Sequence, residues 1–195
     1  MVVLSSYEDI SEITIVKITE KSRTPWKVLF NQIVVHGALV LAIDYLYPEY
    51  LESLPNDELS VSDILTFVFS IDLSNTLFYF IHRLFHSVPW LLRYHEHHHK
   101  NVEVNSIDTF DSGVVEHLML NIGTTLFPPL FLGLPLFLVQ FQIMSFMILA
   151  IISHSSLQIP FLSTPYHQIH HRNRMVNFGQ GLYLYDRLCG SFRSS

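Results

Sequence analysis

Three groups of histidines constrain the fold of this chain more than any other feature of its sequence. The first group has two histidines at i and i+4, and the other two groups share the spacing i, i+3 and i+4. The groups are His82 and His86; His95, His98 and His99; and His167, His170 and His171. Residues with these spacings lie on one face of a helix, and neutral imidazole is the commonest metal ligand in proteins. A fold that brings the groups together would form a metal site.

The composition is typical of a membrane protein. Hydrophobic residues make up 49% of the chain and charged residues 14%, whereas about 25% of the residues in soluble domains are charged. Four mostly apolar runs are long enough to cross a bilayer core. These runs are approximately 26–47, 62–81, 114–132 and 136–153. We expect an all-α fold, a multi-pass membrane helical bundle of about four transmembrane helices with a cytosolic histidine-rich cap. Pro128 and Pro129 are expected to break the third run.

The distribution of charge predicts the orientation of this bundle. All eleven Lys and Arg residues lie in the N-terminal arm, the loop after the second apolar run and the C-terminal tail. With four spans these segments share one side, and the positive-inside rule makes that side cytosolic. The histidine groups fall on the same side. We divide the chain into a cytosolic arm, 1–25, and a single membrane-embedded domain, 26–195. Nothing in this pattern supports nucleic-acid binding.

The number of histidines predicts more than a structural zinc site. A structural zinc site closes at four ligands, and eight imidazoles are enough for two metal ions. Imidazole suits Zn, Cu, Fe and Ni, so the type of ligand does not by itself name the metal.

The arrangement of motifs resembles one known family. The pattern His-x3-His, His-x2-His-His and His-x2-His-His between apolar runs is similar to that of the fatty acid hydroxylase / sterol desaturase superfamily. Val88-Pro89-Trp90-Leu91 resembles the family's link between its first two histidine groups. Asn177-Phe178-Gly179 and the later Tyr185–Ser191 resemble its closing stretch. The resemblance covers about Asp72–Phe192.

The resemblance implies an integral membrane enzyme that uses O2 and a di-metal centre to hydroxylate or desaturate a lipid, either a sterol or a fatty acyl or sphingoid chain. The implied cofactors are two iron ions, with zinc possible in the purified protein. The implied localisation is the endoplasmic reticulum membrane, with the active site facing the cytosol. His154, in an Ile-Ser-His-Ser context, resembles a further family histidine. The implied metal ligands are His82, His86, His95, His98, His99, His154, His167, His170 and His171.

Acidic residues near the histidines are candidates to orient the imidazoles. Metal-bound histidines usually donate their second ring N–H to a carboxylate, a carbonyl or water. Asp108, Asp111, Glu116 and Asp186 are expected on the same face as the metal ligands. Glu116 resembles a family glutamate that follows a His-Pro pair, although Gly113-Val114 replaces that pair here. Asp72 lies inside an apolar run, which makes it a further functional candidate.

Two alternatives belong to other classes of protein. His95-Glu96-His97-His98-His99 matches the zinc hydrolase motif His-Glu-x-x-His. In that hypothesis Glu96 is the general base and His95 and His99 bind zinc, which leaves the other two groups without a role.

The chain could also be a non-catalytic metal-binding membrane protein. A carrier should hold its ligands near the bilayer midplane, where only His36 and Asp72 are expected.

The electrons for O2 reduction are expected to come from outside the chain. The sequence has no Gly-x-Gly-x-x-Gly stretch for a dinucleotide. Its one cysteine, Cys189, excludes a cysteine-ligated iron–sulfur cluster. The resemblance implies an external donor such as cytochrome b5 and its NAD(P)H reductase.

Overall fold

The computed structural model describes residues 30–35, 37–38, 41, 45, 59–155 and 164–194. All regular structure in these residues is helical, which confirms the all-α part of the prediction. The first elements are η1 (Phe30–Val35), α4 (Val61–Ser87), α5 (Pro89–His95), η2 (His98–Lys100) and η3 (Ser106–Phe110). The remaining elements are α6 (Val114–Glu116), η4 (His117–Gly123), α7 (Thr124–Phe131), α8 (Leu136–Ser153), α9 (Thr164–Arg172) and α10 (Leu184–Leu188).

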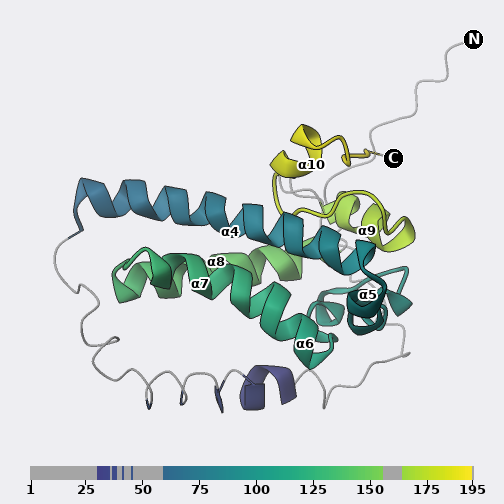
Figure 1. The fold of residues 1–195 in the computed structure, drawn as a ribbon, viewed down its shortest axis with the longest axis horizontal. Helices are drawn as coiled ribbons and strands as arrows, with labels where there is room; N and C mark the ends of the chain where they lie inside the picture. Colours follow the sequence, from purple (N-terminus) through teal and green to yellow (C-terminus); the bar gives the residue numbers. More distant parts are fainter. Residues whose placement is uncertain are drawn as a thin grey trace, which may run out of the picture.

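Helix α4 is the longest element and runs along one side of the bundle (Figure 1). A capping box starts it, because the Ser60 hydroxyl accepts from the Asp63 N–H while the Asp63 carboxylate accepts from the Ser60 N–H. The helix ends at Ser87, before Val88 and Pro89, since a residue that precedes proline is disfavoured in the helical conformation. It therefore continues beyond the expected end at residue 81 and carries the first histidine pair on its last turns.

A helical hairpin packs against α4. Residues 114–131 are helical throughout, in the order α6, η4 and α7, and α8 returns toward the histidines. Gly133, with φ of 65°, makes the turn between α7 and α8. The expected break at Pro128 and Pro129 is wrong, because both prolines lie inside α7. Their carbonyls still accept hydrogen bonds from the N–H groups of Leu132 and Leu134.

Two of the four predicted spans are single helices long and apolar enough to cross a membrane, namely α4 and α8. Within the described fold, 22% of the apolar window of α4 and 28% of that of α8 are buried. The run at 114–132 is divided by the π-helical stretch η4. Most of the run at 26–47 lies outside the described residues.

The bundle is held together by an apolar cluster and a polar contact. Buried Leu134, Leu138 and Val139 form the apolar cluster near the hairpin turn. Deeper in the bundle, the Gln142 amide of α8 accepts from the Ser70 hydroxyl and donates to the Ser74 hydroxyl of α4, both at 2.8 Å. Hydrogen bonds of this kind are a common link between helices in a membrane, where a polar side chain finds few other partners.

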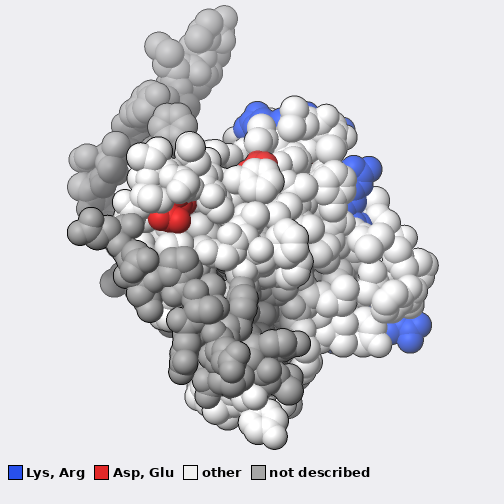
Figure 2. Space-filling model, turned by 60° about the vertical axis from the view of Figure 1, so that its left-hand side comes forward, with Lys and Arg blue, Asp and Glu red and all other residues white. Residues whose placement is uncertain are grey.

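The histidines lie at one end of the bundle. The carboxyl ends of α4 and α8 and the start of α6 meet there, together with α5 and α9 (Figure 1). Residues 61–82 and 113–154 contain no Lys or Arg. Figure 2 shows the Lys and Arg side chains along one side of the molecule and a broad area without charge beside them. The predicted separation of basic residues from apolar runs is therefore present in the described part of the fold.

Candidate metal centre

The structure brings all nine histidines that the sequence singled out into two buried groups. The five-histidine group is His82, His86, His95, His99 and His170. The four-histidine group is His98, His154, His167 and His171. Within each group the candidate ligand atoms lie within 4.8 Å of one another. Each group draws on distant parts of the chain, so neither can form before the bundle does.

The second and third sequence groups each contribute to both structural groups. Helix α5 ends at His95, and the chain then enters the short 3-10 helix η2, where His98 and His99 are adjacent. His99 joins His95 in the five-histidine group, whereas His98 joins the other group. The rings of His95 and His98 still stack with centroids 5.4 Å apart, so the side chains of this sequence group lie together although their nitrogens divide between the two structural groups. On α9, His170 joins the five-histidine group, whereas His167 and His171 join the four-histidine group.

The distances between ring nitrogens match those of ligands around an ion. In the five-histidine group, the Nε2 atom of His95 lies 3.0 Å from the Nε2 atoms of both His82 and His99. In the four-histidine group, the Nε2 atom of His154 lies 3.1 Å from that of His98 and 3.0 Å from that of His167. Two nitrogens at right angles, each about 2.1 Å from a metal, are about 3.0 Å apart.

Backbone carbonyls hold the far side of four of the rings. Nδ1 of His82 donates to the Phe178 carbonyl at 2.6 Å, and Nδ1 of His170 donates to the Val176 carbonyl at 2.7 Å. The rings of His154 and His171 make the equivalent bonds to the carbonyls of Ala150 and Asn101, both at 3.0 Å. A ring that donates from Nδ1 in its neutral form presents a bare lone pair at Nε2.

The carboxylate of Glu116 lies beside the same atom of a fifth ring. Its Oε1 atom lies 2.9 Å from Nδ1 of His95, and its side chain is almost fully buried. His82 and His95 therefore both have Nδ1 beside an acceptor while their Nε2 atoms face each other at 3.0 Å. Two facing lone pairs repel unless a cation lies between them, so this donor set fits a metal ion.

Burial keeps these histidines in the form that binds metal. Desolvation holds the pKa of His98 and His171 well below the usual 6.5, and neighbouring imidazoles lower it further. Burial also lowers the pKa of His154 from 6.5 to about 4, although the hydrogen bond to the Ala150 carbonyl opposes the shift. A neutral ring has no proton to lose before it coordinates. Imidazole ligands of this number suit Fe, Zn, Cu or Ni.

The other predicted acids act on the imidazoles through intermediate groups. Asp186 accepts from the N–H groups of Phe178 and Gly179, at 2.8 and 2.6 Å, and Phe178 in turn binds His82. Asp108 accepts from the Asn101 side chain at 3.0 Å, and the Asn101 carbonyl binds His171.

Asp111 binds the ring of His97 at 3.0 Å, and this ring belongs to neither histidine group. Of the four acids proposed from sequence, Glu116 lies directly beside a candidate ligand.

The four carbonyl acceptors have no signal in the sequence, because every residue carries a carbonyl. The nearest indication was the stretch Asn177-Phe178-Gly179. Asn177 has φ of 53°, a left-handed conformation that asparagine tolerates better than most residues. Its side chain donates to the carbonyls of Tyr166 and Arg193 at 3.1 and 2.8 Å. These bonds hold the bend that places the Val176 and Phe178 carbonyls against the histidines.

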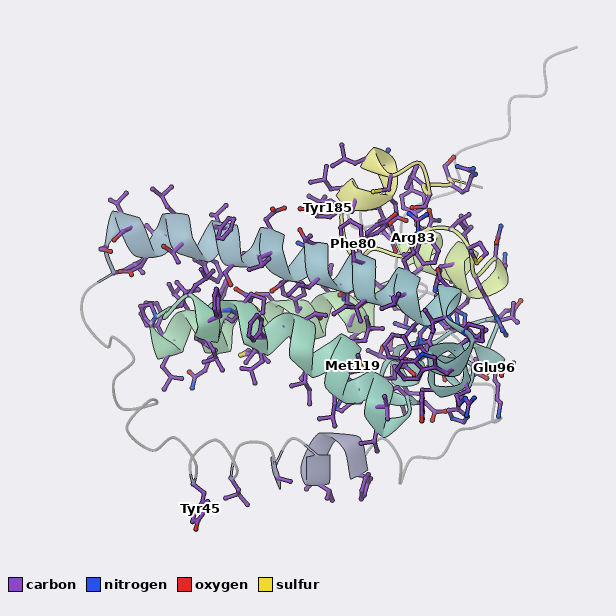
Figure 3. The ribbon with its side chains drawn as sticks, in the orientation of Figure 1. Tyr45, Phe80, Arg83, Glu96, Met119 and Tyr185 are labelled. Atoms are coloured by element: carbon purple, nitrogen blue, oxygen red, sulfur yellow. The ribbon has the colours of Figure 1, made fainter. Side chains whose placement is uncertain are left out.

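Glu96 does not have the position of a hydrolase base. Its side chain is 61% exposed and lies 4.0 Å from Arg174, on the outside of the histidine end (Figure 3). A general base must reach a metal-bound water, and Glu116 is the carboxylate beside the histidines. The His-Glu-x-x-His hypothesis is therefore disfavoured by the geometry.

Asp72 and Asn75, two polar residues within the second apolar run, make their contacts outside the histidine groups. The Asp72 carboxylate on α4 accepts a hydrogen bond from the Tyr185 hydroxyl at 2.8 Å. Figure 3 shows Tyr185 of α10 beside Phe80 of α4. Asn75 donates to the Ile71 carbonyl of its own helix at 3.0 Å. His36 lies outside the described residues.

A cavity opens from the histidines into the apolar bundle. It encloses about 850 Å³ of empty volume, counting the part open to the surroundings. One end is lined by His82, His95, His98, His154 and His167. Its walls come from α4, η4, α7 and α8 and include Phe78, Leu120, Ile143, Phe146 and Met147. A largely apolar cavity that ends at convergent polar groups is the usual form of a small-molecule site.

Comparison with known proteins places this chain among others of similar sequence. The sequence model of the family described as "Fatty acid hydroxylase" matches residues 67–191. "Fatty acid hydroxylase domain-containing protein 2" of Macaca fascicularis is 28% identical over 165 residues, which cover 80% of this chain and 46% of that protein. The human protein of that name is 27% identical over 165 residues, which again cover 80% of this chain and 46% of that protein.

A third relative is the "Cholesterol 25-hydroxylase-like protein" of Danio rerio. It is 26% identical over 197 aligned positions, which cover 90% of this chain and 76% of that protein. The chain spans about half the length of the first two curated relatives. No solved structure matches it.

Proposed function

Because the chain belongs to the fatty acid hydroxylase family, we propose that it is an O2-dependent membrane oxidoreductase that hydroxylates or desaturates a lipid. The observation that carries this proposal is the cavity whose apolar walls meet five of the nine buried histidines. A lipid chain fits walls of Phe, Leu, Ile and Met, and the histidines would hold a metal at the place where the chain ends. The family match supports the same class of reaction.

We assign the nine histidines of the two groups as ligands of two iron ions, one for each group. Bound there, the metal supplies the activation of O2 toward an unactivated C–H bond. The two groups would supply five and four histidine ligands, which would leave each ion accessible to a further ligand such as O2. Zinc would occupy the same donors in protein purified without iron.

The residues of the chain have three tasks in this reaction. The carbonyls of Phe178, Val176, Ala150 and Asn101 hold the rings in one tautomer, and so keep the Nε2 lone pairs directed inward. Glu116 lies 2.9 Å from Nδ1 of His95 and would balance part of the metal charge inside the bundle. The walls of α4, η4 and α8 exclude water and align the lipid.

The overall reaction requires an external source of electrons. Hydroxylation consumes a C–H bond, O2, two electrons and two protons, and yields an alcohol and water. Desaturation removes two hydrogens from neighbouring carbons, consumes the same O2, electrons and protons, and yields a double bond and two waters. We propose a separate donor such as cytochrome b5 with its reductase. Arg172 and Arg174 lie on the surface beside the histidines, where a basic surface would attract an acidic partner.

The same features support a location and a domain division. We propose that residues 26–195 form one membrane-embedded domain after a cytosolic arm, 1–25, and that the histidine end faces the cytosol from the endoplasmic reticulum membrane. The support is that basic residues and histidines share one end of the described bundle, while α4 and α8 present apolar surface. Positively charged segments remain on the cytosolic side during insertion.

The proposal is tested by lipid profiling of cells that express the chain. We expect a new hydroxylated or unsaturated lipid, and we expect its loss in the His170→Ala variant, which removes a candidate ligand. The matched control is His97→Ala, because His97 binds Asp111 and belongs to neither histidine group. Product from His170→Ala at the level of the unmodified chain would contradict the metal assignment. No lipid change with any of the three proteins would contradict the proposed activity.

A further inference from the structure

We propose that Asn121 binds a hydroxyl group of the lipid substrate and thereby places the oxidised carbon only a few bonds from that hydroxyl. The inference rests on the proposed function, since it takes the cavity beside the histidines as the substrate site. It narrows the substrate to lipids with an aliphatic hydroxyl near the reacting carbon. The ring end of a sterol and the headgroup end of a sphingoid lipid both have this chemistry.

Asn121 lies on the π-helical stretch η4 and lines the cavity. A π-helix places an extra residue in the turn and is frequent at functional sites. The return to α-helix is supported by two threonines, because the hydroxyls of Thr124 and Thr125 bind the carbonyls of Leu120 and Asn121. The local backbone therefore departs from an α-helix at the segment that presents Asn121 to the cavity.

The Asn121 amide has hydrogen-bonding capacity that the described residues do not use fully. A primary amide has two N–H donors and an oxygen that accepts. Within the part of the chain that the structure describes, one N–H lies 3.2 Å from Nδ1 of His117. The second N–H and the oxygen then remain for a bound molecule. A hydroxyl group is their complement, because it donates and accepts at once.

Two other polar side chains of the cavity lining donate to backbone carbonyls. Thr109 donates to the Ala150 carbonyl at 3.4 Å, and Gln180 donates to the Phe146 carbonyl at 3.3 Å. Apolar side chains of α8, including Phe146 and Met147, also line the cavity. A hydroxyl buried against these apolar side chains would lose its hydrogen bonds to water without replacement. The Asn121 amide can replace those bonds at its position in the lining.

The distance from Asn121 to the metal centre determines which carbon reacts. Glu116, whose carboxylate touches His95, lies five residues earlier in the same continuous helical run. The α-helical rise of about 1.5 Å per residue is an upper limit for this mostly π-helical stretch, so the two positions are at most about 7.5 Å apart along the axis. A carbon skeleton with bonds of about 1.5 Å covers that distance in about five bonds. The reacting carbon therefore lies near the hydroxyl end of the lipid and not at the far end of its tail.

The test compares the affinity of two proteins for two lipids, one with the hydroxyl and one without it, in each of two lipid classes. The full chain and its Asn121→Leu variant are purified in detergent, and lipid affinity is obtained from the thermal stabilisation that each lipid produces. The probes are cholesterol against 5-cholestene, which lacks the hydroxyl, and a dihydroceramide against its analogue without the C3 hydroxyl. Asn75→Leu is the matched control, because it makes the same chemical change on α4 outside the cavity lining. Asn121→Ala serves as a second variant if the leucine variant does not fold.

We expect the unmodified chain and Asn75→Leu to bind one hydroxylated probe about tenfold more tightly than its analogue, which is the contribution of one or two hydrogen bonds. In Asn121→Leu this preference should disappear. A preference confined to cholesterol assigns a sterol, and one confined to dihydroceramide assigns a sphingoid lipid. Equal affinities in the unmodified chain, or a preference that survives in both Asn121 variants, would overturn the inference. Because lipid affinity is measured without turnover, this test can be interpreted even if the proposed oxidation is not observed.

Discussion

Replacement of Asp186 by Asn should release metal from the five-histidine group while the four-histidine group keeps its own. Asp186 is fully buried and accepts three hydrogen bonds, from the Phe178 and Gly179 N–H groups and the Ser191 hydroxyl, at 2.8, 2.6 and 2.7 Å. The space is tight, because a Cβ atom at Gly179 would lie 2.7 Å from the carboxylate. The Phe178 carbonyl, which this carboxylate positions, accepts from His82 at 2.6 Å.

The magnitude follows from the number of bonds that are lost. An asparagine keeps one acceptor oxygen but turns an NH2 group toward at least one backbone N–H. The loss of a charged acceptor and the resulting unpaired donor cost about 2–4 kcal/mol of folding free energy. Displacement of the Phe178 carbonyl removes the hydrogen bond that orients His82, and the loss of such a bond lowers metal affinity about 10- to 100-fold. No comparable chain of contacts joins Asp186 to the four-histidine group among the described residues.

The assay is a competition between the purified protein and a chelator, with metal counted per chain. We expect two ions in the unmodified protein and loss of one at a chelator concentration 10- to 100-fold lower in Asp186→Asn. Asp111→Asn is the matched control, because Asp111 binds His97 outside both groups. Ser191→Ala removes only one of the three bonds and should give a smaller shift. Equal loss from both groups, or no shift in affinity with an intact fold, would refute the reasoning.

Three further predictions test the site, the topology and the electron source, and a fourth concerns pH. Glu96→Gln should keep most lipid oxidation while His98→Ala abolishes it; the opposite ranking would favour a hydrolase. Glycosylation acceptors inserted near Asn56 should be modified and those near Lys100 should not, whereas modification near Lys100 would exclude four spans. Purified chain with NADH, O2 and lipid should be inactive until donor proteins are added, so turnover without them would contradict an external donor. Metal-free protein should lose thermal stability as pH falls from 6.5 toward 4. Burial lowers the pKa of His154 to about 4, so in this pH range only the unfolded chain takes up the proton. An unchanged melting temperature across that range would argue against this account.

The sequence was sufficient to select the histidines and the class of fold. Each ligand candidate lies in a short group with helical spacing or, for His154, at the end of an apolar run, so local pattern and family resemblance identify it without knowledge of the fold. The apolar runs likewise predicted helices, because a backbone in lipid must satisfy its own hydrogen bonds. Family membership followed from the same motifs.

Local pattern failed where a residue depends on what lies across the bundle. Pro128 and Pro129 looked like a break, yet both are inside α7, where the hairpin packs against α4. The three histidines of the second group lie close together, as their spacing predicts, yet their nitrogens divide between the two structural groups. The histidines of α9 divide in the same way although that helix is continuous, so helical spacing predicts proximity but not which group each ring joins.

The partners of the imidazoles could be assigned only from the folded chain. Phe178, Val176, Ala150 and Asn101 contribute carbonyls, which are identical in every residue and leave no trace in side-chain pattern. Their positions depend on where α8 ends, on the bend at Asn177 and on the carboxylate of Asp186. Ligand identity is encoded in side-chain chemistry along the chain. Ligand orientation depends on backbone groups that long-range packing brings within hydrogen-bonding distance, and a one-dimensional pattern does not contain those distances.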